Sequence, residues 1–258
     1  MAHRPRLIPC LLLSEGNLVK TTRFKNPNYL GDPINAVKIF SEKCVDELCV
    51  QDIEASKNGR GPDFDLLSDI ASEAFMPLSY GGGLTTLEQA AKLFHIGFEK
   101  VILNTAFVDN PRLISQIAER FGVQSVTASI DVRQDLFKRY RCYAAGGTRP
   151  LNESPQDLAQ RAQELGAGEI LLNAIDRDGM MQGYDLKLIK AVASVVDVPL
   201  IACGGARDAR DMEQALHQAG AHAVAAGSMF VYFGPLKAVL INVPEEAELY
   251  ETGVYQRG

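Results

Sequence analysis

Residues 77–107 read PLSYGGGLTTLEQAAKLFHIGFEKVILNTAF, and residues 199–230 read PLIACGGARDARDMEQALHQAGAHAVAAGSMF. Each stretch predicts a short apolar strand that ends in two glycines, followed by a helix, a further glycine and a second strand with a small polar end. An internal repeat of this kind constrains the architecture more strongly than any single residue does. The repeat predicts two similar halves, each with a glycine-rich loop.

Alternating strands and helices extend over the whole sequence. Apolar runs of strand length are expected at 7–13, 47–51, 78–80, 100–104, 125–131, 169–173, 200–203 and 223–226. Runs with helical periodicity are expected at 33–43, 64–73, 87–95, 111–121, 155–165, 186–195, 209–218 and 236–241. Eight such units in about 250 residues match a (β/α)8 barrel. An open, doubly wound sheet is the alternative, but two similar half-barrels favour closure into one domain over residues 1–258.

The composition predicts a cytoplasmic protein without a metal or a redox cofactor. The chain has 258 residues, a net charge of −6 and five scattered cysteines with no CxxC pair. A negative net charge does not favour nucleic acid, and unpaired cysteines fit a reducing compartment. The longest apolar run, 7–13, is too short to span a bilayer. We therefore expect neither nucleic acid nor a membrane as a partner.

Two glycine-rich loops mark the first candidate site, because the active sites of such barrels form at the carboxyl ends of the strands. Glycine lets backbone N–H groups approach a phosphate closely. Two loops at matching positions predict a ligand with two phosphates, one at each side of the barrel mouth; tight turns without a ligand are the alternative. The phosphate-binding candidates are Gly82, Gly83, Asn104, Thr105, Gly204, Gly205, Gly227 and Ser228.

Asp131, at the end of the fifth expected strand, is the candidate for acid–base catalysis. A salt bridge or a loop cap is the alternative role. The repeat aligns Asp131 with Leu12 in the first strand, and leucine cannot transfer a proton. Glu15 lies three residues further on, in the loop. The other strand-end candidates, expected to contact substrate, are Asp52, Asn173 and Asp178.

Four charged residues fall at or just before the starts of expected strands, which is the opposite end of the barrel. They are Arg6, Glu47, Lys100 and Glu169. Two cations and two anions around one opening predict a ring of salt bridges that closes the central channel. Ordinary charges on the rim, each contributing little, are the alternative.

Several motifs together resemble the HisA/HisF family, and within it the HisF cyclase subunits of imidazole glycerol phosphate synthase. They are IPCLLLSEGNLVKT, DELCVQDIEAS, YGGGLTTLEQA, EKVILNTAF, ASIDVR, GAGEILLNAIDRDGMMQGYD, IACGGA and AAGSMF. The resemblance implies a barrel on whose bottom a HisH-type glutaminase docks and releases ammonia. The ammonia passes up the barrel and reacts with a bis-phosphorylated ribulosyl substrate (PRFAR), giving imidazole glycerol phosphate and AICAR.

The same resemblance implies roles for individual residues. The four charges at the bottom match the family's ammonia gate. Lys20 matches its loop lysine and Asp131 matches one of two catalytic aspartates, so both are candidate catalytic residues. The departures are Leu12 in place of the other aspartate, Ser14 in place of a lysine, Asn173 in place of a threonine and Val231 in place of a histidine.

These departures favour a HisF-like subunit that receives ammonia and supplies it to a phosphorylated acceptor or to a third enzyme. The third enzyme would amidate a nucleotide sugar for a surface polysaccharide, as some HisF-like proteins are thought to support. The alternative is an authentic cyclase in histidine biosynthesis. A HisA-type isomerase is disfavoured, because an isomerase needs no ammonia gate.

Overall fold

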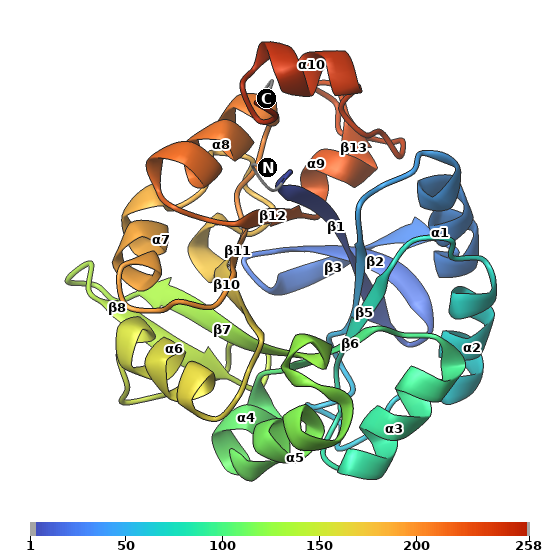
Figure 1. Ribbon diagram of the computed structural model, residues 1–258. Coiled ribbons are helices and arrows are strands. Elements are labelled where there is room, and N and C mark those ends of the chain that lie inside the picture. Colours follow the sequence, from blue (N-terminus) through green and yellow to red (C-terminus); the bar gives the residue numbers. More distant parts are fainter. Residues whose placement is uncertain (1–3, 257–258) are drawn as a thin grey trace.

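The computed structural model describes residues 4–256, and its eight central strands close into a parallel barrel (Figure 1). Each strand pairs with the next one along the chain, and β12 pairs with β1 to complete the ring. This confirms the (β/α)8 architecture. The barrel strands are β1 (Arg6–Ser14), β4 (Leu48–Asp52), β5 (Leu78–Gly81), β6 (Lys100–Leu103), β7 (Val126–Gln134), β10 (Glu169–Ala174), β11 (Leu200–Cys203) and β12 (Ala223–Ala226).

Helices cover the outside of the barrel (Figure 1). Their starts follow from local sequence: Asp32 accepts a hydrogen bond from the backbone of Asn35, and Thr86 and Gln89 form a reciprocal capping box. The helices are α1 (Pro33–Glu42), α2 (Phe64–Ser72), α3 (Leu87–Ile96), α4 (Thr105–Asp109), α5 (Arg112–Phe121), α6 (Pro155–Glu164), α7 (Leu186–Ala193), α8 (Ala209–Glu213), α9 (Ser228–Val231) and α10 (Glu246–Glu251).

Strand alternation divides the buried side chains into two cores. On β1, Leu7 and Leu11 belong to the large core between the sheet and the helices, whereas Ile8 and Cys10 belong to a smaller core inside the barrel. The inner core also contains Cys49, Ile102, Leu171, Ile201, Cys203, Ala223 and Ala225. The alternation therefore fixes which residues face the barrel lumen.

Two long connections, after β1 and within and after β7, are hairpins. The first consists of β2 (Asn17–Thr22) and β3 (Lys25–Gly31), and β2 pairs with the end of β1. The second extends β7 and adds β8 (Tyr140–Ala144) and β9 (Arg149–Pro150). Both hairpins leave from the carboxyl ends of their barrel strands, so they stand at the mouth.

The prediction of a helix at 236–241 is wrong. The segment instead forms a small hairpin from β13 (Tyr232–Phe233) and β14 (Ala238–Val239), whose turn contains Gly234 with a φ of +70°. Leu236 is 94% exposed, so its apolar side chain has no core to face. Apolar periodicity alone therefore gave the wrong prediction, because an amphipathic helix needs a surface against which its apolar face can be buried. No helix within residues 4–256 is long and apolar enough to cross a membrane.

Candidate functional site

A pocket opens at the carboxyl ends of the barrel strands, where the sequence placed the site. Most of the predicted residues line it together, although they come from all parts of the chain. The lining includes Leu12, Lys20, Asp52, Gly82, Gly83, Asn104, Thr105, Asp131, Asn173, Asp178, Gly204, Gly205, Gly227 and Ser228. The structure thus brings together every residue predicted for phosphate binding, substrate contact and catalysis.

The two glycine loops require glycine for steric reasons. Gly82 has a φ of +126°, and a Cβ there would lie 2.4 Å from the Asp52 carbonyl oxygen. Gly205 has a φ of +113°, and a Cβ there would lie 2.2 Å from the Gly183 carbonyl oxygen. Gly82 therefore packs closely against the end of β4, and Gly205 against the loop that follows β10, while both line the pocket. This geometry suits the close approach of a phosphate to backbone N–H groups.

Asp131 is a buried carboxyl group of the pocket, 7% exposed and, among the residues that the structure describes, without a cation beside it in an ion pair. Burial and, secondly, the nearby charge of Asp178 raise its pKa, and a hydrogen bond from Ser129 lowers it in part; together they bring the pKa to about 7. A carboxyl group with this pKa can donate or accept a proton near neutrality. It is therefore suited to general acid–base chemistry.

No second free carboxylate takes the place of Leu12 in the pocket. Glu15 is exposed in the turn after β1 and does not line the pocket. Asp52 does line it, but its Oδ1 accepts hydrogen bonds from the backbone N–H groups of Glu54 and Ala55, both at 2.9 Å. Asp178 is engaged by Lys20. Asp52 and Asp178 are therefore engaged in contacts within the fold, and Leu12 adds no carboxylate to the pocket.

Lys20 and Asp178 form a buried ion pair under the β2–β3 hairpin. Lys20 Nζ lies 2.7 Å from Asp178 Oδ1, and the Thr21 hydroxyl donates to Asp178 Oδ2 at 3.0 Å. The backbone N–H of Arg23 also donates to the Asp178 carbonyl oxygen. Three interactions therefore hold this hairpin against the loop that follows β10.

Asn104 and Thr105 connect the pocket to the second hairpin. The Asn104 side-chain amide donates to the carbonyl oxygens of Ser129 and Tyr143, and Thr105 Oγ1 accepts from the backbone of Ala145. Their side chains are therefore used within the fold. If these residues bind phosphate, they would do so through the groups that these hydrogen bonds leave free at the wall of the pocket.

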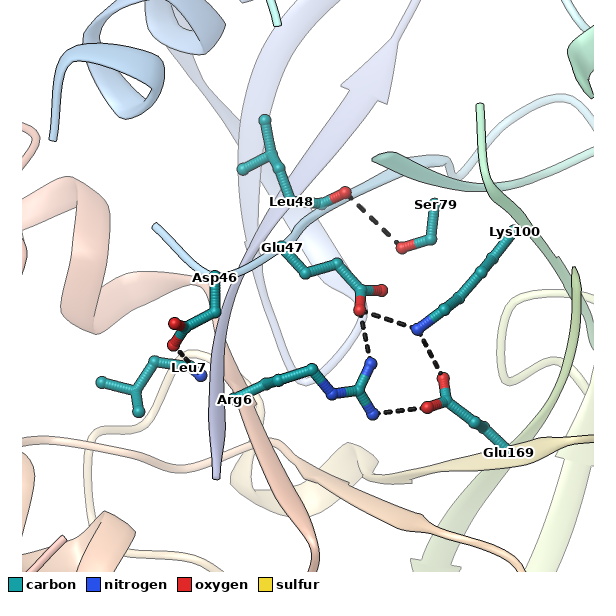
Figure 2. Close-up of polar contacts among 8 residues, drawn as sticks. All are labelled: Arg6, Leu7, Asp46, Glu47, Leu48, Ser79, Lys100 and Glu169. Atoms are coloured by element: carbon teal, nitrogen blue, oxygen red, sulfur yellow. Dashed lines mark hydrogen bonds and ion pairs between the residues drawn. The ribbon is translucent and has the colours of Figure 1, made fainter. Parts of the chain in front are cut away.

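At the other end of the barrel, the four predicted charges form a closed ring (Figure 2). Arg6 pairs with Glu47 at 2.5 Å and also with Glu169, and Lys100 Nζ lies 2.8 Å from Glu47 and 2.9 Å from Glu169. We call this set the bottom ring. Burial disfavours the charge of Arg6, but Glu169 and Glu47 outweigh it and raise the pKa of Arg6 above its ordinary value.

Above the bottom ring, the lumen is lined mainly by apolar side chains and thiols. Cys10, Cys49 and Cys203 belong to this inner core, and Cys10 and Cys203 also border the pocket. These packed side chains thus fill the inside of the barrel between the bottom ring and the pocket. Sequence reasoning treated the cysteines as scattered. Cys10 is four residues after Arg6, and Cys49 is two residues after Glu47. Because side chains alternate along a strand, these even spacings could have predicted that both thiols face the inside of the barrel.

Sequence reasoning also missed two residues that shape the pocket. Thr21 anchors the first hairpin through Asp178, and Ser56 Oγ accepts a hydrogen bond from the backbone of Gly83 at 3.1 Å. Both depend on contacts between segments that are distant in sequence, so no local pattern identifies them.

Comparison with known proteins decides the family. The model of the histidine biosynthesis protein family matches residues 6–237. The chain belongs to the HisA/HisF family. It is 49% identical over 246 residues to a Pseudomonas aeruginosa protein with the provisional name imidazole glycerol phosphate synthase subunit hisF2, covering 95% of this chain and 98% of that one.

Two further relatives are also similar over most of their length. A Leptospira interrogans protein, provisionally named imidazole glycerol phosphate synthase subunit HisF, is 48% identical over 95% of this chain and 97% of its own. The Streptomyces coelicolor imidazole glycerol phosphate synthase subunit HisF is 42% identical over 90% of this chain and 92% of its own. The chain is thus a HisF-like member of the family, similar both to a numbered paralogue and to a HisF subunit without a provisional name.

Proposed function

We propose that this chain is the synthase subunit of a glutamine amidotransferase that carries ammonia but does not perform the family's cyclisation. A HisH-type glutaminase would dock on the bottom face, and ammonia would pass the bottom ring, rise through the lumen and reach the pocket. The acceptor would be a phosphorylated compound or a third enzyme, such as one that amidates a nucleotide sugar for a surface polysaccharide.

The proposal is supported by a contrast between the two ends of the barrel. All four charges of the bottom ring are present and paired. At the mouth, Leu12 stands where the resemblance implies a second catalytic aspartate, and no free carboxylate of the described lining replaces it. The bottom ring, as the proposed entrance for ammonia, thus has all four of its charges, whereas the proposed proton-transfer apparatus lacks one group, whose contribution is typically about 10²–10⁴-fold.

The roles of the other pocket residues follow from their chemistry. The loops at Gly82–Gly83 and Gly204–Gly205 would bind the two phosphates, assisted by Ser228. Asp131 would exchange a proton with the ligand, and Lys20 would leave Asp178 for an incoming anion. The apolar lumen would pass neutral ammonia more readily than ammonium, because burying an unpaired charge is costly.

An authentic cyclase is the second candidate function. It is favoured by the 42% identity to the Streptomyces coelicolor subunit and by the buried Asp131 with its pKa of about 7. The two candidates differ in one result, which is turnover of PRFAR.

Docking of the glutaminase tests the proposal without knowledge of the acceptor. Phe75 is 91% exposed in the loop that leads into β5, which places it on the bottom face, and Leu136 is fully exposed at the tip of the β7–β8 hairpin at the opposite end. A HisH-type glutaminase should bind the wild-type chain and Leu136→Glu equally in analytical ultracentrifugation, and should bind Phe75→Glu more weakly. A wild-type chain that binds no such glutaminase would refute the proposed partner.

A further inference from the structure

Two buried polar atoms in the pocket have no hydrogen-bond partner. They are Asn173 Oδ1 and Ser228 Oγ. The other buried side-chain atoms without a hydrogen bond among the described residues belong to Tyr80 and Arg161 and lie outside the pocket. A buried polar atom without a partner destabilises the fold, so most such atoms are paired in native proteins. Two of them facing one pocket indicate groups kept for a ligand.

Asn173 has a defined place in the barrel. On β10, Glu169 belongs to the bottom ring and Leu171 to the lumen, so Asn173 faces inward by the same alternation. It is 7% exposed and lies in register with Asp131 on β7 and with Cys203 on β11. The amide therefore stands at the upper end of the lumen, directly beside the buried carboxyl group.

The amide oxygen also adjoins one of the glycine loops. A Cβ on Gly204 would lie 3.0 Å from Asn173 Oδ1. A phosphate held by Gly204 and Gly205 would thus have Asn173 as a neighbour. The phosphate itself cannot satisfy this atom, because amide and phosphate oxygens are both hydrogen-bond acceptors. The missing partner must be an N–H or O–H group.

We propose that Asn173 is a specificity-determining residue, whose Oδ1 accepts a hydrogen bond from an N–H or O–H group that the ligand carries next to the phosphate bound at Gly204–Gly205. The inference rests on the proposed function, because it takes that phosphate site as given. It names the class of ligand more closely: a phosphate ester with a hydrogen-bond donor beside the phosphate, rather than a bare phosphate or a ligand that is apolar there.

Ser228 provides the matched contrast. Its hydroxyl can donate to a phosphate oxygen, whereas Asn173 Oδ1 cannot. Removing the two groups should therefore affect different ligands. Asn173→Leu keeps the side chain's approximate shape and removes the whole amide, the Oδ1 acceptor together with the Nδ2 group. Ser228→Ala removes the hydroxyl donor.

The test is isothermal titration of wild type, Asn173→Leu and Ser228→Ala with PRFAR and with inorganic phosphate. Asn173→Leu should weaken PRFAR binding by about tenfold or more and change phosphate binding less than about twofold, because a site built around a buried acceptor loses affinity when that acceptor is removed. Ser228→Ala should weaken both probes. Asn173→Ala repeats the comparison with only a methyl group beside Gly204.

A second readout separates a role in binding from a role in folding. Since Oδ1 has no partner in the free protein, the Tm of ligand-free Asn173→Leu should equal or exceed that of wild type. A Tm several degrees lower, or PRFAR binding equal to wild type, would overturn the inference.

The two proposals fail in different ways. Wild type that binds PRFAR no more tightly than inorganic phosphate overturns the role of Asn173 and leaves the phosphate sites standing. Wild type that binds neither probe overturns the phosphate sites of the proposed function, and the inference with them.

Discussion

Lys20 Nζ lies 2.7 Å from Asp178 Oδ1, and this ion pair joins the β2–β3 hairpin to the loop that follows β10. The side chains are only 4% and 12% exposed, so the pair is screened little by solvent. Removing one partner of a buried pair leaves an uncompensated charge, which costs more than the pair itself contributes. The stability of the hairpin over the mouth therefore depends on this contact.

Lys20→Met should lower the free energy of unfolding by about 3 kcal/mol, because it leaves Asp178 buried and unpaired. The double variant with Asp178→Asn should recover most of the loss. Arg149 pairs with Asp109 at 2.6 Å, but these side chains are 45% and 52% exposed. Arg149→Met is therefore the control and should cost less than about 0.5 kcal/mol in the same urea titration. Equal effects at the two sites would contradict the argument from burial.

Asp131 should make stability depend on pH. Its pKa is raised from 3.8 to about 7, mainly by burial and secondly by Asp178. Between these values the folded state binds more protons than the unfolded state, so this group's stabilising contribution is complete below about pH 4 and is lost as the pH rises through about 7. The full effect is on the order of 4 kcal/mol.

Asp131→Asn removes the titrating group while keeping its shape. The variant should gain stability relative to wild type at pH 8, and the difference should shrink toward pH 4. Urea unfolding of both proteins across this range measures it. A constant difference between the two proteins would show that Asp131 does not titrate in this window.

The bottom ring should be sensitive to the loss of one cation. Arg6→Met leaves Glu47 and Glu169 with Lys100 alone, and should cost about 1–3 kcal/mol, reduced because a quarter of the Arg6 side chain is exposed. Arg4, at the same end of the barrel, pairs with Asp46 and Glu246 while 53% exposed. Arg4→Met is the control, and thermal unfolding should place it closer to wild type than Arg6→Met.

Leu12→Asp should restore a second carboxylate to the pocket. If proton transfer is what the chain lacks, PRFAR turnover with ammonium should rise by about 10²-fold or more over wild type. Leu12→Asn has a similar shape without a titrating group, and should give no gain. A null result for Leu12→Asp would show that more than this carboxylate is missing.

The sequence predicted the barrel and both ends of its lumen because these follow from local periodicity. Inward-facing positions recur every second residue, so Arg6 and Glu47 could be placed at the bottom and Asp131 at the mouth. The Lys20–Asp178 pair could not be predicted, because it joins residues 158 positions apart. The sequence also could not predict that Asn173 Oδ1 lacks a hydrogen bond, because only the packing of distant segments shows which polar atoms have partners. The hairpin at 232–239 was missed because its apolar residues imitate helical spacing.

Turnover of PRFAR by the wild-type chain with saturating ammonium, and without any partner, tests the central claim most directly. Titration with inorganic phosphate shows in parallel that the pocket is intact. We predict phosphate binding without formation of imidazole glycerol phosphate and AICAR. Robust turnover would contradict this account and make the chain a working cyclase despite Leu12.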